Sequence, residues 1–439
     1  MDTQLQPPEG MKRYAKTVVR WITNLAERMG GKPLSGINHK LDRYLLAEAH
    51  TELAGNRAAG IDGESKAGFA KDLTARVKGL LTRVHDGSWR APAVRRVEIP
   101  KGDGKTRPLG IPTYEDKVLQ KAFVMLVEPV FEREFHPGSY GYRPKRSVQQ
   151  AVKATHEALY AGHHWVIELD IKGYFDSIPH ALLQDMFRRR ITDGIMNRLI
   201  LGWLKAGVMK EGAWQATESG TPQGGIVSPL LANLYLNDVL DQWFEHEVKP
   251  RLKASAILVR YADDAVLCFK EETDARRVYA VMSKRFEKYG LTLHPEKTKL
   301  VHFQRSSGGP GGEETGFKIL GFHFYMGQSR QGRSVPKEKT DGTRLRKALQ
   351  NVWEHCREQR HKPLAEQHAA LKAKVQGHIN HYAISNNTRS LQYYLREVER
   401  IWRYWLNRRG APKPLSWEEF VAIVNRWPWA QISIKHQFF

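Results

Sequence analysis

Three aspartates are placed where they could hold a pair of divalent metal ions. Asp263 and Asp264 are adjacent at the bend of an expected hairpin, and Asp170 lies towards the end of an earlier expected strand. Two ions roughly 3.5–4 Å apart need anionic oxygens that separate elements deliver to one point. Such a site transfers phosphoryl groups, because one ion activates an attacking hydroxyl and the other stabilises the leaving group.

Asp170 and Asp263 would bridge the two ions, with Asp264 beside them and the backbone carbonyl of Ile171 as a further oxygen ligand. Oxygen ligands of this kind predict Mg²⁺, two ions in all, with Mn²⁺ as a substitute. Two adjacent aspartates alone are also typical of an acidic surface turn. The choice therefore depends on the elements that carry them.

The periodicity of the sequence predicts the elements that position these aspartates. Alternating apolar and polar residues predict a strand over residues 165–171. Short apolar runs over residues 257–260 and 265–269 flank the Tyr-Ala-Asp-Asp segment and predict a hairpin. A second hairpin is predicted around a Gly-Asp-Gly turn within residues 94–111, with basic side chains near its tip.

Helical patterns surround these strands. They cover the first 90 residues, residues 183–204 and residues 230–246, and they continue alone beyond residue 340, after a Gly-rich loop over residues 306–312. Mixed strands and helices in this order predict an α+β catalytic body followed by an all-α region.

The charge of the chain indicates a polyanionic partner. Lys and Arg number 69 against 47 Asp and Glu, a formal net charge of +22 spread over the whole length. This predicts an extended surface for nucleic acid, although a basic protein without such a partner would have the same composition. The two cysteines, Cys268 and Cys356, exclude a disulfide framework and a cysteine-based zinc module. Without a signal peptide or an apolar run of roughly 20 residues, we expect a soluble protein of the cytoplasm and no membrane partner.

Five motifs, in order along the chain, resemble those of reverse transcriptases. Residues 168–176 resemble the first metal-binding strand of that family, and residues 260–264, Arg-Tyr-Ala-Asp-Asp, resemble its central active-site motif. Residues 220–231 resemble the Pro-Gln-Gly segment that packs against the templating base pair, and residues 291–299 and 319–322 resemble the last two palm motifs. The resemblance implies a right-hand polymerase with fingers and palm that copies RNA into DNA.

The resemblance also implies roles for residues around the sugar and the base. Phe175 occupies the place of the steric gate, whose ring excludes the ribose 2′-hydroxyl and favours deoxynucleotides. A bulky ring at this position is also compatible with core packing. Gln223 and Gly224 would allow the backbone to approach the base pair closely.

Three basic residues match those that bind the triphosphate. Lys101 and Arg107 resemble the fingers residues that grip the phosphates, Arg as a bidentate fork and Lys as a mobile charge. Lys297 would assist the departure of pyrophosphate, with Lys299 nearby.

Over residues 50–410 the wider resemblance is to group II intron reverse transcriptases that are also maturases. Residues 56–63 resemble the amino-terminal extension of that family, and residues 111–113 and 139–144 resemble its fingers, where Arg143 would contact nucleic acid. Residues 377–382 resemble the thumb or X domain, and a following helix face would contact intron RNA through Arg396, Arg400 and Arg403. The implied partners are group II intron RNA, an RNA template with a DNA primer or target DNA, and deoxynucleoside triphosphates.

Four consecutive regions are expected. They are a basic amino-terminal extension with the start of the fingers (residues 1–90), fingers and palm (91–335), the thumb or X domain (336–412) and a short tail that contacts DNA (413–439). No cysteine follows Cys356, so the cysteine-bearing endonuclease domain of the longest family members is not expected. His355, Cys356 and His361 are too few ligands for a zinc site. The protein would act in the bacterial cytoplasm, close to the nucleoid.

Other reverse transcriptases fit less well. Retron enzymes usually carry a Val-Thr-Gly signature near the thumb, which this sequence lacks, and diversity-generating enzymes alter the Pro-Gln-Gly segment, which is intact here. A repurposed relative in DNA repair or phage defence stays open. So does a non-catalytic RNA chaperone or splicing factor, although Asp170, Asp263 and Asp264 favour an enzyme.

Overall fold

The computed structural model of the protein describes residues 11–102, 105–210, 213–215, 220, 224–304, 316–410, 413–429 and 431–438. It contains helices and strands in the expected mixture, which confirms the α+β class. The chain forms two compact units that alternate along the sequence. The first comprises Met1–Pro144, Asp170–Arg251 and Ala280–His294, and the second Lys145–Leu169, Leu252–Tyr279 and Pro295–Phe439.

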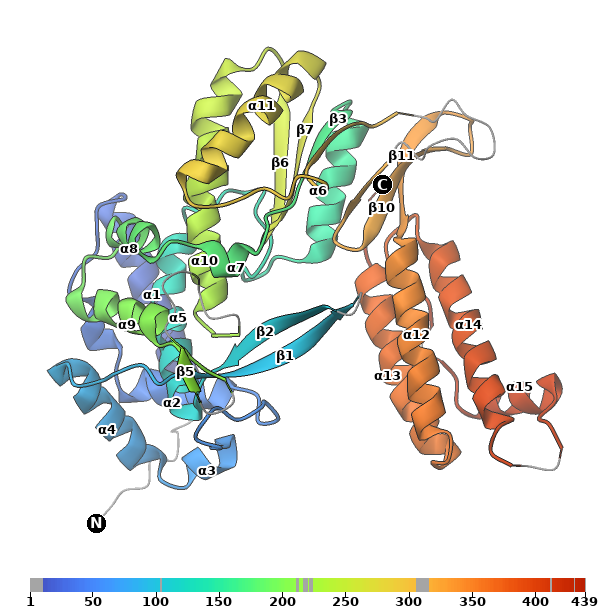
Figure 1. Ribbon diagram of the computed structural model, residues 1–439, viewed down its shortest axis with the longest axis horizontal. Helices are drawn as coiled ribbons and strands as arrows, with labels where there is room; N and C mark the ends of the chain where they lie inside the picture. The colour runs from blue at the N-terminus through green and yellow to red at the C-terminus, as the bar shows by residue number, and fades with distance from the viewer. Residues whose placement is uncertain are drawn as a thin grey trace. The chain divides into compact units, whose positions relative to one another are not determined.

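The amino-terminal part of the first unit is helical, as its sequence predicts (Figure 1). Gly30 and Gly31 follow the first helix with positive φ angles of 55° and 87°, a backbone that glycine adopts without strain. Asp42 caps the next long helix, since its carboxylate accepts hydrogen bonds from two backbone amides of the first turn. The elements are α1 (Met11–Met29), η1 (Ile37–Lys40), α2 (Arg43–Glu52), α3 (Lys66–Ala70), α4 (Leu73–Asp86) and α5 (Tyr114–Glu132).

A four-stranded sheet of the first unit contains the hairpin predicted over residues 94–111. Strand β1 (Val94–Gly102) pairs antiparallel with β2 (Lys105–Ile111), from Arg95 opposite Ile111 to Gly102 opposite Lys105. Strands β4 (Val208–Lys210) and β5 (Ala213–Gln215) complete the order β2-β1-β4-β5. The hairpin prediction is confirmed.

The helical stretch expected over residues 183–204 is two helices, α8 (His180–Arg188) and α9 (Gly194–Lys205). The first ends because Ile191 pairs with Leu34 as an isolated bridge. The second begins where Asp193 accepts hydrogen bonds from the amides of Ile195 and Met196. Helix α10 (Ser228–Leu236) continues into two π-helical turns, η2 (Asn237–Asp241) and η3 (Phe244–Val248), before the 3₁₀ turn η4 (Lys249–Arg251).

The second unit is built on an antiparallel sheet of order β6-β7-β3-β8. Strand β3 (Trp165–Leu169) is central, between β7 (Asp264–Phe269) and β8 (Lys299–His302), and β6 (Ala256–Tyr261) forms the other side of the expected hairpin. Helix α6 (Val148–Tyr160) packs on it, and α11 (Glu272–Lys288) begins in this unit. A second sheet, β11-β10-β9, contains β9 (Phe317–Ile319), β10 (Phe322–Gln328) and β11 (Ser334–Thr340).

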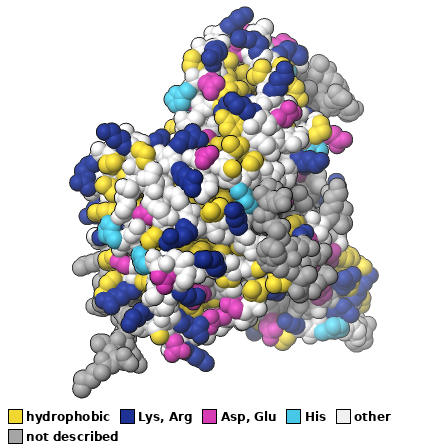
Figure 2. Space-filling model, turned by 60° about the vertical axis from the view of Figure 1, so that its left-hand side comes forward, with side chains coloured by type: hydrophobic (Ala, Val, Ile, Leu, Met, Phe, Trp, Pro, Cys, Tyr) yellow, Lys and Arg dark blue, Asp and Glu magenta, His cyan; other side chains and the backbone are white. Residues whose placement is uncertain are grey.

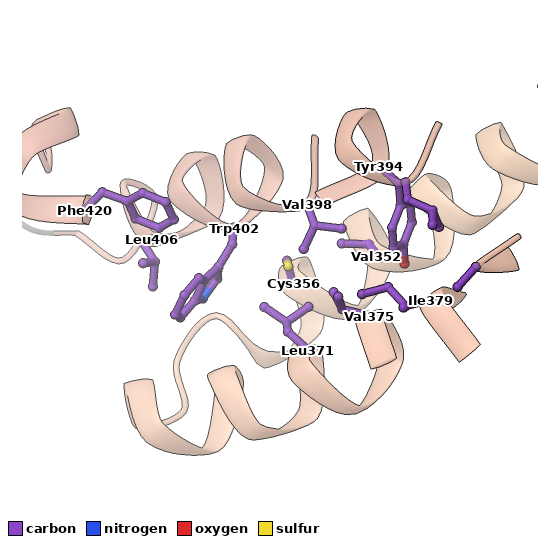
Figure 3. Close-up of a cluster of buried hydrophobic side chains, with 12 residues drawn as sticks. Val352, Cys356, Leu371, Val375, Ile379, Tyr394, Val398, Trp402, Leu406 and Phe420 are labelled. Carbon is purple, nitrogen blue, oxygen red and sulfur yellow. The ribbon is translucent and has the colours of Figure 1, made fainter. Parts of the chain in front are cut away.

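Four helices follow, which confirms the helical pattern beyond residue 340 (Figure 1). Helices α12 (Gly342–Gln359), α13 (Leu364–Tyr382) and α14 (Thr388–Leu406) lie side by side, and α15 (Trp417–Arg426) comes after them. Figure 3 shows side chains from several of these helices pointing into one buried cluster. Trp402 is fully buried there, and its indole nitrogen donates to the Gln367 side chain at 3.0 Å.

Both cysteines, Cys268 and Cys356, are buried free thiols. Among the described residues, none of the helices combines the length and apolar character that a membrane span requires.

Candidate active site

A buried arginine fixes the bend that carries Asp263 and Asp264. Arg260 has no exposed surface, and its guanidinium donates to the carbonyl of Ala262 at 2.9 Å. Ala262 has a φ angle of 56°, a left-handed conformation that is strained for a residue with a side chain. Asp263 is partly exposed and Asp264 exposed, so both carboxylates are accessible to ligands. Arg260 is part of the sequence motif, but the motif implies no role for it. An arginine within an apolar strand is the sequence feature that could have indicated this structural role.

The strand register brings the end of β3 beside this bend. Leu169, the last residue of β3, pairs with Ala265, the residue after Asp264. The chain therefore leaves β3, and reaches Asp170, at the same end of the sheet at which β7 begins. In the first unit, the carbonyl of Asp170 accepts a hydrogen bond from the amide of His294 at 2.8 Å, and Ile171 pairs with Leu293.

The predicted metal ligands are oxygen donors that divalent ions such as Mg²⁺ prefer. Within the described residues, no three His, Cys, Asp or Glu side chains are gathered closely enough to hold one metal ion. Asp170 belongs to the first unit, and Asp263 and Asp264 to the second. A site that uses all three carboxylates and the Ile171 carbonyl therefore stays a prediction, supported by the chemistry of the donors and the strand register.

Phe175 lies in a short helix, α7 (Tyr174–Ser177), which begins after Gly173 with a φ angle of 58°. Its side chain is partly exposed, whereas the neighbouring Tyr174 is buried and donates its hydroxyl to the carbonyl of Ala232 at 2.5 Å. The two ring centroids lie 5.4 Å apart, and the ring planes are inclined at 61°. Tyr174 thus fills the core position, which favours the gate over core packing for Phe175.

Gly224 packs where no side chain fits. Its φ angle is 110°, and an added Cβ atom would lie 2.6 Å from the carbonyl oxygen of Gly110 and 2.8 Å from Leu109 Cδ1. Only glycine therefore fits against β2 at this position, and the predicted approach of this backbone to the base pair stays a prediction. Gln223 lies outside the described residues.

The residues predicted to bind the triphosphate are Lys101, Arg107 and Lys297. Arg107 pairs with Ile99 through the backbone of the β1–β2 hairpin, but the side chains of Lys101 and Arg107 lie outside the described part of the chain. Lys297 is exposed in the loop before β8. Their roles stay predictions.

Arg143 is buried, and its guanidinium is bound within the protein. It donates to both carboxylate oxygens of Glu132, at 2.9 and 2.7 Å, and to the carbonyls of His136 and Ser139, both at 2.7 Å. These bonds tie the turn after α5 to the helix itself. Arg143 therefore has a structural role here, and its predicted contact with nucleic acid is untested.

The exposed face of α14 differs from the expected one. Arg396 and Arg400 are exposed, whereas Arg403 is partly buried at the edge of that face and donates to the carbonyl of Leu415 at 2.8 and 3.1 Å. The exposed residues of α14 lie on one face of the helix, here called the α14 stripe: Arg389, Gln392, Tyr393, Arg396, Arg400 and Tyr404. Figure 2 shows Lys and Arg side chains scattered among acidic and apolar ones over the described residues of the face in view.

Residues 99–324 match the family described as reverse transcriptase (RNA-dependent DNA polymerase). The chain belongs to this family, which confirms the polymerase fold and activity inferred from the motifs. Enzymes of this family use divalent metal ions, an RNA or DNA template, a primer and nucleotides.

Several relatives resemble the chain in particular. It is 32% identical to Protein YkfC of Escherichia coli over 336 residues, 67% of this chain and 85% of that protein. It is 40% identical to the group II intron-encoded protein LtrA of Lactococcus lactis over 209 residues, 46% of this chain and 34% of LtrA. Nuclear intron maturase 2 of Arabidopsis thaliana is 26% identical to this chain over 176 residues, which are 31% of this chain and 24% of the maturase. These relatives confirm the resemblance to group II intron reverse transcriptases.

Proposed function

We propose that the protein copies group II intron RNA into DNA and assists the splicing and retrohoming of that intron. The observation that carries the proposal is the Asp263–Asp264 bend, held by buried Arg260 at the sheet end where β3 leads into Asp170. The similarity to LtrA and to an intron maturase supports intron RNA as the partner. We place this activity in the bacterial cytoplasm near the nucleoid, where the net charge of +22 favours nucleic acid.

Asp170, Asp263, Asp264 and the Ile171 carbonyl would hold two Mg²⁺ ions. When bound, the ions lower the barrier to attack of the primer 3′-hydroxyl on the α-phosphate and to release of pyrophosphate. The side chains of the protein bind and orient the substrate. Lys101 and Arg107 bind the triphosphate, and Lys297 neutralises the departing pyrophosphate.

Two further residues select the nucleotide. The partly exposed ring of Phe175 contacts the sugar and excludes a 2′-hydroxyl. Gly224, beside Gln223, lets the backbone lie against the templating base pair. A side chain at residue 224 would collide with the Gly110 carbonyl and displace this backbone.

Two assays on the wild-type chain test the proposal. We expect primer extension on an RNA template in the presence of Mg²⁺, and faster splicing of a group II intron precursor when the protein is added. Splicing without extension would identify an RNA chaperone. Primer extension without any effect on splicing would contradict the maturase role. The protein would then be a polymerase that copies another template.

The α14 stripe is the proposed contact with intron RNA. Arginines that neutralise phosphates release counterions, so binding weakens as salt increases. Replacing Arg396 and Arg400 together with Gln should weaken RNA binding by about one to two orders of magnitude near 0.1 M salt. The slope of log K against log salt should become shallower by about 1.4–1.8, measured by filter binding over a salt series.

Arg403→Gln is the matched control from the same helix. It removes one positive charge, where the double variant removes two, but its loss should lower the melting temperature through the Leu415 contact and leave the salt slope nearly unchanged. Equal salt slopes for the wild type and the double variant would show that the α14 stripe is an ordinary solvated surface and does not contact RNA.

A further inference from the structure

A chain of buried and partly buried hydrogen bonds runs through the first unit and ends at the segment that precedes α10. Asp116 and Gln120 lie one turn apart on α5, and each is 3% exposed. The Trp203 indole on α9 donates to one carboxylate oxygen of Asp116 at 2.7 Å, and the Gln120 amide donates to the other at 2.8 Å. The amide oxygen of Gln120 accepts from the backbone amides of Ile226 and Val227, at 2.7 and 3.3 Å.

The charge state of Asp116 sets the direction of these bonds. Burial raises the pKa of Asp116 to about 6, so at neutral pH the carboxylate is mostly ionised and both oxygens are acceptors. Gln120 must then turn its NH₂ group towards Asp116. Its oxygen is thereby directed at the amides of Ile226 and Val227, which no other orientation of the Gln120 amide would satisfy.

The two amides follow Gly224 and Gly225 directly in the chain. Gly224 packs against the carbonyl of Gly110, so the segment is held on one side by β2 and on the other by Gln120. A buried amide without an acceptor destabilises the fold, so the bonds from Gln120 help to determine where this backbone lies.

We propose that Gln120, oriented by Asp116, is a positioning residue that holds residues 224–227, the described end of the Pro-Gln-Gly motif, against the templating base pair. The inference rests on the proposed function of that segment. Gln120 touches no substrate itself, and it acts through the backbone that does.

Gln120→Met tests the proposal, because Met keeps the volume and removes the acceptor. The KM for the correct deoxynucleotide should rise about tenfold, and misincorporation should increase, while kcat at saturating nucleotide stays within about twofold. Trp203→Phe is the control: it removes a hydrogen bond to the same carboxylate and lowers the melting temperature, but it leaves the orientation of Gln120 and the KM unchanged.

Asp116→Asn provides a rescue test. The Asn side chain has one acceptor, so it cannot receive both Trp203 and Gln120, and Gln120 loses its fixed orientation. Adding Trp203→Phe removes the competing donor, and the KM of the double variant should return towards that of the wild type. A structural role alone predicts instead that the double variant is worse than either single variant.

Amide hydrogen exchange separates failure of this inference from failure of the proposed function. In Gln120→Met, exchange at Ile226 and Val227 should accelerate about tenfold or more in the intact chain. Unchanged exchange, or a KM that rises equally in Gln120→Met and Trp203→Phe, would overturn the positioning role. Faster exchange in a protein that never extends a primer on intron RNA would overturn the proposed function, and with it the base-pair role.

Discussion

Replacing Asp263 with Asn abolishes primer extension, with a loss of about a thousandfold or more, and leaves RNA binding close to that of the wild type. The substitution keeps the shape of the side chain and removes the negative charge that would hold a divalent ion. The lost transition-state stabilisation, about 4 kcal/mol, corresponds to this factor. Single-turnover extension on an RNA template, with Mg²⁺ titrated from zero, measures both the rate and the metal requirement.

Glu271→Gln is the matched control, since Glu271 is an exposed carboxylate just beyond the other end of β7. It removes one negative charge from the same hairpin and should leave extension unchanged. Extension by Asp263→Asn at a near wild-type rate would show that this bend does not bind the metal, and the acidic-turn interpretation would replace the site.

Truncation of Phe175 to Val should increase ribonucleotide incorporation relative to deoxynucleotide incorporation by about one to three orders of magnitude. The ring excludes the 2′-hydroxyl by steric contact, and relief of a clash worth about 1.4–4 kcal/mol corresponds to this range. Because the ring is partly exposed and makes no proposed metal contact, the rate with deoxynucleotides should change little. Single-nucleotide incorporation kinetics with matched ribo- and deoxynucleotides measure the ratio.

Tyr174→Phe separates a gate from a packing residue. Tyr174 is the buried neighbour, and loss of its hydrogen bond to the Ala232 carbonyl should lower the melting temperature without a change in sugar preference. If Phe175 were a core residue, its truncation to Val would leave a cavity, lower the melting temperature and reduce both activities in proportion. A proportional loss would remove the gate, and part of the case for DNA as the product.

Local sequence patterns were sufficient for the elements of the candidate site. Two-residue alternation identifies β3, and the apolar runs around Tyr-Ala-Asp-Asp identify the β6–β7 hairpin, since both patterns reflect which face of a strand is buried. The sequence over residues 183–204 predicts one helical stretch because its apolar periodicity continues through the break between α8 and α9. A pairing between Ile191 and the distant Leu34, together with the Asp193 cap, divides it.

The sequence by itself determined the α+β class, the reverse transcriptase family and the aspartates that could bind metal, because these follow from residue types at short spacing. Only the tertiary structure decided which polar side chains are available. Arg143 and Arg403 are basic in any reading of the sequence, yet both are bound to carbonyls within the fold. Gln120 reaches the amide of Ile226 across 106 residues of chain. Such hydrogen-bond partners depend on which surfaces come into contact when the core is buried. Local periodicity in the sequence does not predict these contacts.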